Sequence, residues 1–297
     1  MPTSERVVGI FAVIGALTAA LAATPLAAQQ TADQSSSSNS FRVCADPNNL
    51  PFSNREKQGF ENKLAELVAA ELGEKVTYSW HAQRRGFVRE TLKAKKCDVV
   101  MGVPAHYDLV ETTIPYYRSS YVFISRADRH LDISSIKDPR LRDLQKIGVQ
   151  LIGDDGFNTP PVHALSRQGI IKNLVGYTVY GDYRVPNPPA RIVTAVERGD
   201  VDIAAVWGPL AGFFAKQSPV PLTVTPITET ASFAPLIFDY DIAMGVRKHD
   251  DALKTKLDDI IARKQPQITA LLHEYGIPTL PVAAGKTSES ERNSSLK

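Results

Sequence analysis

The sequence has few of the groups on which enzymes and metal sites depend. Its six histidines show no His-x-x-x-His spacing, and its two cysteines form no Cys-x-x-Cys pair, so a zinc site is not expected. It also contains no Gly-x-Ser-x-Gly turn and no glycine-rich phosphate loop. We therefore predict that the chain is not an enzyme and that it holds no metal ion or cofactor of its own.

A dominant charge of one sign is also missing. The 297 residues include 34 basic and 32 acidic side chains, which gives a formal net charge of +2, and the two signs are interspersed. Such a surface produces no field that would attract nucleic acid or an anionic membrane. We therefore expect neither as a partner.

The N-terminus has the pattern of a secretory signal. One basic residue, Arg6, precedes an apolar run from Val7 to Ala23, and small and then polar residues follow. We predict a signal peptide over residues 1–28, a Ser-rich linker over residues 29–40, and export to the periplasm. A retained N-terminal membrane anchor is the alternative.

Cys44 and Cys97 are the only cysteines, and export to an oxidising compartment permits a disulfide between them. The run "CDVVMGV" is expected to be a strand that opens at Cys97. If it lies parallel to the strand "FRVCAD", the two cysteines are offset by about three residues, or ~10 Å. That exceeds the ~7 Å limit for a bridge. A register slip of two residues would remove the obstacle, so a disulfide and two buried thiols both stay open.

From residue 41 the chain alternates β-rich runs with amphipathic helical patterns, which is typical of an α/β fold. About 270 residues exceed one ordinary hydrophobic core, which favours two lobes, each a mostly parallel sheet flanked by helices. We predict lobe 1 over residues 41–126 plus 239–280, lobe 2 over residues 127–238, and a flexible tail over residues 281–297. Two hinge crossovers are expected, near "YVFISRAD" and "FAPLIFDYD".

Three helices illustrate the pattern. "FENKLAELVAAEL" is amphipathic and is followed by Gly73, a typical C-terminal stop. "GFVRETLKAKK" is expected to be the second helix of lobe 1. The last helix, "DALKTKLDDIIARKQPQITALLHEYG", is expected to break near Pro266. This helix and the strand before it can bury their apolar faces by returning to lobe 1.

Several ordered motifs resemble the type II periplasmic solute-binding proteins, notably the polar amino-acid receptors. They include "LPF" after Asp46, "KCDVVMGV", "PYY" at residues 115–117, "IGVQ", "RGDVDIAAVW" and "EYGIP". The runs "VCADPNNLPFSN", "QRRGFVRETL", "CDVVMGVPA" and "VWGPLAGFFA" are similar to the J-type (MxaJ/XoxJ) periplasmic proteins that are associated with quinoprotein methanol dehydrogenases. This resemblance implies a two-lobed binding fold and a partner enzyme that uses PQQ.

This sequence replaces the two charged residues with which amino-acid receptors bind the carboxylate and the ammonium group of their ligand. Relative to the family pattern, His106 stands where receptors place an arginine for the ligand carboxylate, and Trp207 stands where they place an aspartate for the ammonium group. Neutral histidine lacks the two-pronged guanidinium, and tryptophan offers an apolar face with one donor. Asp154 and Asp155 would also repel an anion. A free amino acid is therefore not the expected ligand.

Ligands of open α/β sheets bind beyond the carboxyl ends of the parallel strands. That rule predicts a mostly apolar cleft with a few polar groups, suited to a weakly charged or apolar ligand or to a protein segment. The candidate cleft residues are Asp46, Asn48, Asn49, Phe52, Trp80, Gln83, Arg84, His106, Tyr107, Tyr117, Asp154, Asp155 and Trp207.

Some of these residues also have simpler interpretations. Asp46 before Pro47 suits a turn, and Trp207 suits packing at a strand end. His106 suits an exposed loop, and "QRRGFVRE", which contains Arg84, suits a solvated helix start.

Two functions of different classes remain. The first is an accessory protein that assists assembly, activation or cofactor loading of a periplasmic methanol dehydrogenase, through its cleft or its surface. The second is a receptor that delivers a small, weakly charged or apolar solute to an ABC transporter.

Overall fold

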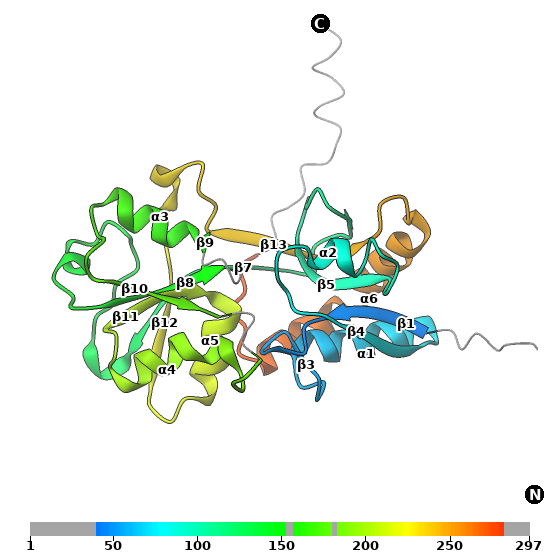
Figure 1. Cartoon of the computed structure of the whole chain (residues 1–297), viewed down its shortest axis with the longest axis horizontal. Helices are drawn as coiled ribbons and strands as arrows, with labels where there is room; N and C mark the ends of the chain where they lie inside the picture. The colour runs from blue at the N-terminus through cyan, green and yellow to red at the C-terminus, as the bar shows by residue number, and fades with distance from the viewer. Residues whose placement is uncertain (1–39, 153–156, 180–182, 282–297) are drawn as a thin grey trace, which may run out of the picture. The chain divides into compact units, whose positions relative to one another are not determined.

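The computed structural model (Figure 1) describes residues 40–152, 157–179 and 183–281. Within these ranges, eight strands of one sheet follow a single path: β10 (Leu174–Thr178), β8 (Ile147–Ile152), β11 (Ile203–Trp207), β7 (Tyr117–Arg126), β13 (Asp239–Val246), β5 (Val99–Pro104), β1 (Ser40–Ala45) and β4 (Lys75–Trp80). Off this path, β12 (Leu222–Pro226), β6 (Glu111–Thr112) and β9 (Phe157–Asn158) pair with β7, β13 and β8. The predicted signal peptide, Asp154, Asp155 and the tail beyond residue 281 lie outside the described residues.

The described helices lie between these strands, except for the last one, which follows β13. They are α1 (Phe60–Leu72), α2 (Phe87–Glu90), α3 (Pro160–Arg167), α4 (Arg191–Arg198), α5 (Gly208–Gln217) and α6 (Asp251–Glu274). Short 3-10 turns cover Ala127–Arg129, Pro139–Arg142, Pro188–Ala190 and Thr230–Phe233, and a two-stranded ribbon joins β2 (Asn48–Asn49) to β3 (Ser53–Asn54).

The first lobe is built on β1, which lies parallel to both β4 and β5. Helix α1 buries Phe60, Leu64 and Val68 against this sheet, so its apolar stripe faces the core. Its end is the predicted one, because Gly73 adopts a left-handed conformation with φ of 69° and its N–H bonds back to the last turn. The second lobe repeats this plan with β8 parallel to both β10 and β11.

The second predicted helix, "GFVRETLKAKK", is wrong beyond Glu90. Helix α2 covers only Phe87–Glu90, and turns follow. Thr91 has left the helical conformation, and Lys95 has a φ of 58°, which a right-handed helix cannot contain. Leu92 and Cys97 are both fully buried. The turns therefore direct both side chains into the core, whereas a straight helix would hold them apart.

Cys44 and Cys97 form a disulfide, with 5.4 Å between their Cα atoms. The predicted offset was right, since Cys44 pairs with Val100 across β1 and β5. The predicted start of the strand was wrong, because β5 begins at Val99 and not at Cys97. Cys97 lies in the preceding turn, where the Asp98 N–H donates to the Arg42 carbonyl and draws the turn toward β1.

The two predicted crossovers correspond to β7 and β13, which are the two longest strands that the structure describes. Residues 117–120 of β7 pair with β13, whereas residues 121–126 pair with β11 and β12 (Figure 1). The strand pairing therefore changes lobes between Ser120 and Tyr121. The lobe boundary that the sequence predicts at residue 126 stays a proposal.

The break predicted in the last helix does not occur, since α6 continues through Pro266. One proline removes one backbone hydrogen bond, at a cost of about 3 kcal/mol. Ile260 and Ile261 before the proline and Ile268 and Leu272 after it are all buried in the same cluster as Phe41 and Leu64. Packing on both sides of Pro266 keeps the two halves aligned and places α6 on the core of the first lobe.

Candidate functional site

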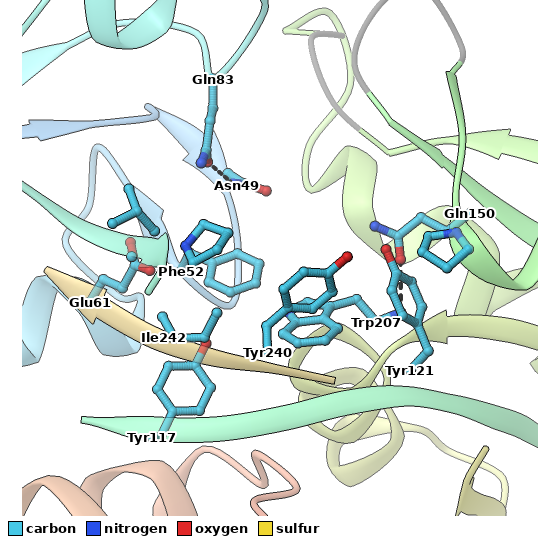
Figure 2. Close-up of a pocket in the computed structure, with 14 residues that line it drawn as sticks. Asn49, Phe52, Glu61, Gln83, Tyr117, Tyr121, Gln150, Trp207, Tyr240 and Ile242 are labelled. Carbon is cyan, nitrogen blue, oxygen red and sulfur yellow. Dashed lines mark hydrogen bonds between the residues drawn. The ribbon is translucent and has the colours of Figure 1, made fainter. Parts of the chain in front are cut away.

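A cavity of about 300 Å³ lies beside β7 and β13, and side chains of both lobes line it (Figure 2). The first lobe contributes Phe52 from the loop before α1, Glu61 from the first turn of α1, and the end of β5. The second lobe contributes Gln150 of β8 and Trp207 of β11. The described lining residues are Asn49, Phe52, Glu61, Gln83, Gly102, Val103, Pro104, Tyr117, Tyr121, Gln150, Pro160, Trp207, Tyr240 and Ile242.

Aromatic rings form much of the cavity wall. Trp207 lies edge-to-face between Tyr121, at 5.3 Å between ring centroids, and Tyr240, at 5.8 Å. Its backbone N–H donates to Gln150 Oε1 at 2.9 Å, which fixes the end of β11. Trp207 therefore packs at a strand end and also lines the cavity, so both of its interpretations apply. Figure 2 shows Trp207 and Tyr240 between Asn49, Gln83 and Glu61 on one side and Gln150 on the other.

Glu61 is the acidic group among the described lining residues. It is partly exposed because it faces the cavity, yet protein atoms enclose its carboxyl group closely. This desolvation raises the pKa of Glu61 to about 8. Glycine at position 102 makes room for it, since an alanine Cβ there would clash with Glu61 Oε1. At neutral pH most molecules therefore carry a protonated Glu61, whose carboxyl group is able to donate a hydrogen bond to a ligand.

We predict that Glu61→Gln reduces the pH dependence of stability. In the unfolded chain Glu61 ionises near its ordinary pKa of 4.5, and in the folded chain near 8. The folded state thus binds a proton that the unfolded state releases, and stability falls as pH rises between these values, by up to about 1.4 kcal/mol per pH unit. Urea unfolding from pH 5 to 9 should show a shallower fall for Glu61→Gln. Equal slopes for Glu61→Gln and for Glu66→Gln, on the exposed side of α1, would contradict this assignment.

Asp46 does not face the cavity and instead orders the loop beside it. Its side chain accepts hydrogen bonds from the Asn48 N–H at 2.8 Å, the Gln83 N–H at 2.7 Å and the Tyr183 hydroxyl at 2.9 Å. The first of these is the turn that the sequence suggested as an alternative. The bond to Gln83 holds that residue next to Asn49.

Asn49 presents a buried polar group to the cavity. The residue is 2% exposed, and its Nδ2 donates to Gln83 Oε1 at 2.9 Å. Its Oδ1 is buried without a hydrogen-bond partner among the described residues. Figure 2 shows this oxygen directed away from Gln83. A buried acceptor without a partner is unfavourable, so a ligand that donates to Asn49 Oδ1 would stabilise the site.

A second, wider cavity of about 810 Å³ holds other candidates. Asn48 and Trp80 line it, and the Arg84 guanidinium stacks over its Tyr183 ring at 5.6 Å. Asn48 also connects the lobes, because its Nδ2 donates to the Val185 carbonyl and its Oδ1 accepts from the Asn187 N–H. None of Asn48, Trp80 and Arg84 lines the aromatic cavity.

The thirteen candidates therefore separate into groups. Asn49, Phe52, Gln83, Tyr117 and Trp207 meet in the first cavity. His106 and Tyr107 are exposed and do not line either cavity, and His106 is in a left-handed loop conformation with φ of 62°. This agrees with the exposed-loop interpretation of His106.

Sequence reasoning missed four polar or aromatic lining residues, namely Glu61, Tyr121, Gln150 and Tyr240. A glutamate in the first turn of a helix usually complements the helix dipole at the surface, so Glu61 gave no separate signal. Tyr121 and Tyr240 lie in the strands taken as crossovers. Gln150 belongs to the quoted motif "IGVQ", which could have identified it.

The described part of the chain contains no cluster of three or more His, Cys, Asp or Glu side chains that could hold a metal ion. No described lining residue of the first cavity is Lys, Arg or His. No described helix combines the length and the apolar character that a membrane crossing requires.

Two α/β lobes joined by paired strands, with a cavity between the strand ends, define a solute-binding protein of the type II fold. The sequence profile of the bacterial extracellular solute-binding proteins, family 3, matches residues 41–276, and the chain belongs to this family.

Two of its relatives share nearly their whole length with it. Protein MoxJ of Methylorubrum extorquens is 35% identical over 300 residues, which cover 95% of this chain and 97% of MoxJ. The crystal structure of the periplasmic binding protein XoxJ from Methylobacterium extorquens is 35% identical with a TM-score of 0.67, and the match covers 82% of this chain and all of XoxJ.

A third similar protein is MxaJ from Methlophaga aminisulfidivorans. Its crystal structure is 29% identical, with a TM-score of 0.69, over 81% of this chain and all of MxaJ. The predicted resemblance to J-type proteins and the predicted fold class are both confirmed.

Proposed function

We propose that this chain is a periplasmic accessory protein that assists a PQQ-dependent methanol dehydrogenase. The observation that carries the proposal is a binding fold in which the described residues of the cavity wall lack the charged pair that a free amino acid requires. The described lining residues offer one acid, which is mostly protonated at neutral pH, and aromatic walls. Similarity to MoxJ, XoxJ and MxaJ along the whole fold supports the link to methanol oxidation.

The role we propose is stabilisation of one state of the dehydrogenase during assembly, activation or cofactor loading. A protein shifts such a population only if it binds one state more tightly than another. The chain itself needs no catalytic group for this role. Its action takes place in the periplasm after cleavage of the signal peptide.

The experiment is deletion of the gene, followed by assay of methanol dehydrogenase activity and PQQ content in periplasmic extract. We expect dehydrogenase polypeptide to be present with reduced activity, and plasmid-borne wild-type chain to restore it. Normal activity together with normal PQQ content in the deletion strain would contradict the proposal.

The second candidate function is a receptor that delivers a small solute to a membrane transporter. The cavity of about 300 Å³, in which Asn49 Oδ1 is buried without a partner among the described residues, favours it. A solute at a hundred times its Kd would stabilise the fold by about 2.7 kcal/mol, which a thermal-shift screen detects.

A further inference from the structure

We infer that the aromatic cavity binds a small organic cation of the alkylammonium class, with Glu61 as its counter-charge and the rings of Phe52, Tyr121, Trp207 and Tyr240 as its walls. This inference rests on the proposed use of the cavity as a ligand site. It names the chemistry of the ligand, which neither proposed function specifies.

The first argument is the charge of the cavity wall. Glu61 contributes a carboxyl group, and no Lys, Arg or His is present among the described lining residues. The Glu61 carboxyl group also forms no hydrogen bond or ion pair with any of those residues. A desolvated carboxyl group without a cation beside it is destabilising when ionised, and a cationic ligand is the group that would offset this cost.

The second argument is that the fold provides space for this acid. Gly102 lies at the point where a Cβ would clash with Glu61 Oε1, and the hydroxyl of buried Tyr116 is close by. Tyr116 itself donates to the Met101 carbonyl at 2.9 Å, so it does not satisfy the carboxyl group. The carboxyl group is therefore held at the cavity wall without a partner among the residues that the structure describes.

The third argument is the nature of the remaining surface. A quaternary or alkylated ammonium ion has a diffuse charge and weak hydrogen-bonding demands, and aromatic faces attract it electrostatically. Phe52, Tyr121, Trp207 and Tyr240 supply such faces around one cavity. Asn49 Oδ1, buried without a described partner, would accept a hydrogen bond from an N–H or hydroxyl of the same ligand.

Ionisation of Glu61 should therefore accompany binding. The titratable groups that sense its charge are Tyr78 of β4 and Tyr116, and Tyr117 and Tyr240 also line the cavity. Burial raises the pKa of Tyr78 to about 12, raises that of Tyr116 well above its usual range, and also raises that of Tyr240. The Lys57 ammonium group lies over the Tyr78 ring at 5.7 Å. Of Glu61, Tyr78, Tyr116 and Tyr240, Glu61 is the one whose pKa lies near neutral pH.

The test compares choline with 3,3-dimethylbutan-1-ol, which has the same shape with carbon in place of nitrogen. Isothermal titration calorimetry on the purified chain should show choline binding at least about tenfold more tightly than the neutral alcohol. Titrations at pH 7.5 in two buffers of different ionisation enthalpy should show release of most of one proton for each choline bound.

Glu61→Gln should remove both the preference for choline and the proton release, whereas Glu66→Gln on the exposed side of α1 should retain both. Circular dichroism would establish that both variants are folded. Equal affinity for choline and the alcohol, or no binding of either to folded wild-type protein, would overturn the inference. These results are independent of the dehydrogenase assay, so failure of one proposal is distinguishable from failure of the other.

Discussion

Replacement of both cysteines by alanine is expected to lower the free energy of unfolding by about 4 kcal/mol. The disulfide joins residues 53 positions apart, and it restricts the unfolded chain far more than the folded one. Loop-closure entropy for a segment of this length accounts for the expected magnitude. Both cysteines are buried, so the change also removes contacts with Phe87 and Leu92. Urea unfolding under oxidising conditions measures the difference.

Reducing agent provides the matched control. The wild-type chain should lose a similar amount of stability once a thiol titration shows that the bridge is open, and the double alanine variant should not respond. If the wild-type chain with an open bridge unfolds at the same urea concentration as the oxidised chain, the entropic account of this disulfide is wrong.

Gly59→Ala is expected to destabilise the chain by about 3 kcal/mol through a steric clash. The added Cβ would collide with the Phe52 carbonyl group and would lie 2.6 Å from the Ser53 nitrogen. That carbonyl accepts the Glu61 N–H at 3.0 Å, so the clash falls on the contact that starts α1. Backbone atoms on both sides leave little freedom to adjust. Thermal unfolding followed by circular dichroism tests this.

Gly169→Ala serves as the comparison. Gly169 has a φ of 74°, and a Cβ added there would meet no atom within 4 Å, so alanine introduces left-handed strain without a clash, at about 1 kcal/mol. Gly59 has a φ of −75°, which alanine adopts freely. If Gly169→Ala proves more destabilising than Gly59→Ala, the close approach of α1 to residues 52 and 53 is not what makes glycine necessary at position 59.

The regular elements could be predicted because local pattern and final packing agree in them. In α1 the apolar spacing and Gly73 both specify the same helix, and β1, β8 and β11 are short β-rich runs with helices after them. The errors lie where tertiary contacts overrule the local signal. Pro266 stays helical because buried isoleucines hold both sides of it, and the residues after Glu90 turn because Cys97 must reach β1.

The candidate site was predicted only in part, because some of its residues lie at strand ends and others depend on tertiary contacts. Phe52, Gln83 and Trp207 follow strands or precede helices, where the rule for parallel sheets places ligand sites. Glu61, Tyr121 and Tyr240 come from a helix start and from the connecting strands β7 and β13, and their positions depend on how the lobes are joined. Sequence spacing contains no information on that geometry, since their neighbours in space are distant in the chain.

The measurement that tests the central claim most directly is the PQQ content per molecule of methanol dehydrogenase in periplasmic extract, with and without the gene for this chain. The account predicts a lower ratio and lower activity in the deletion strain, with both restored by the wild-type chain supplied from a plasmid. An unchanged ratio and unchanged activity would contradict it and would favour the role of a solute receptor.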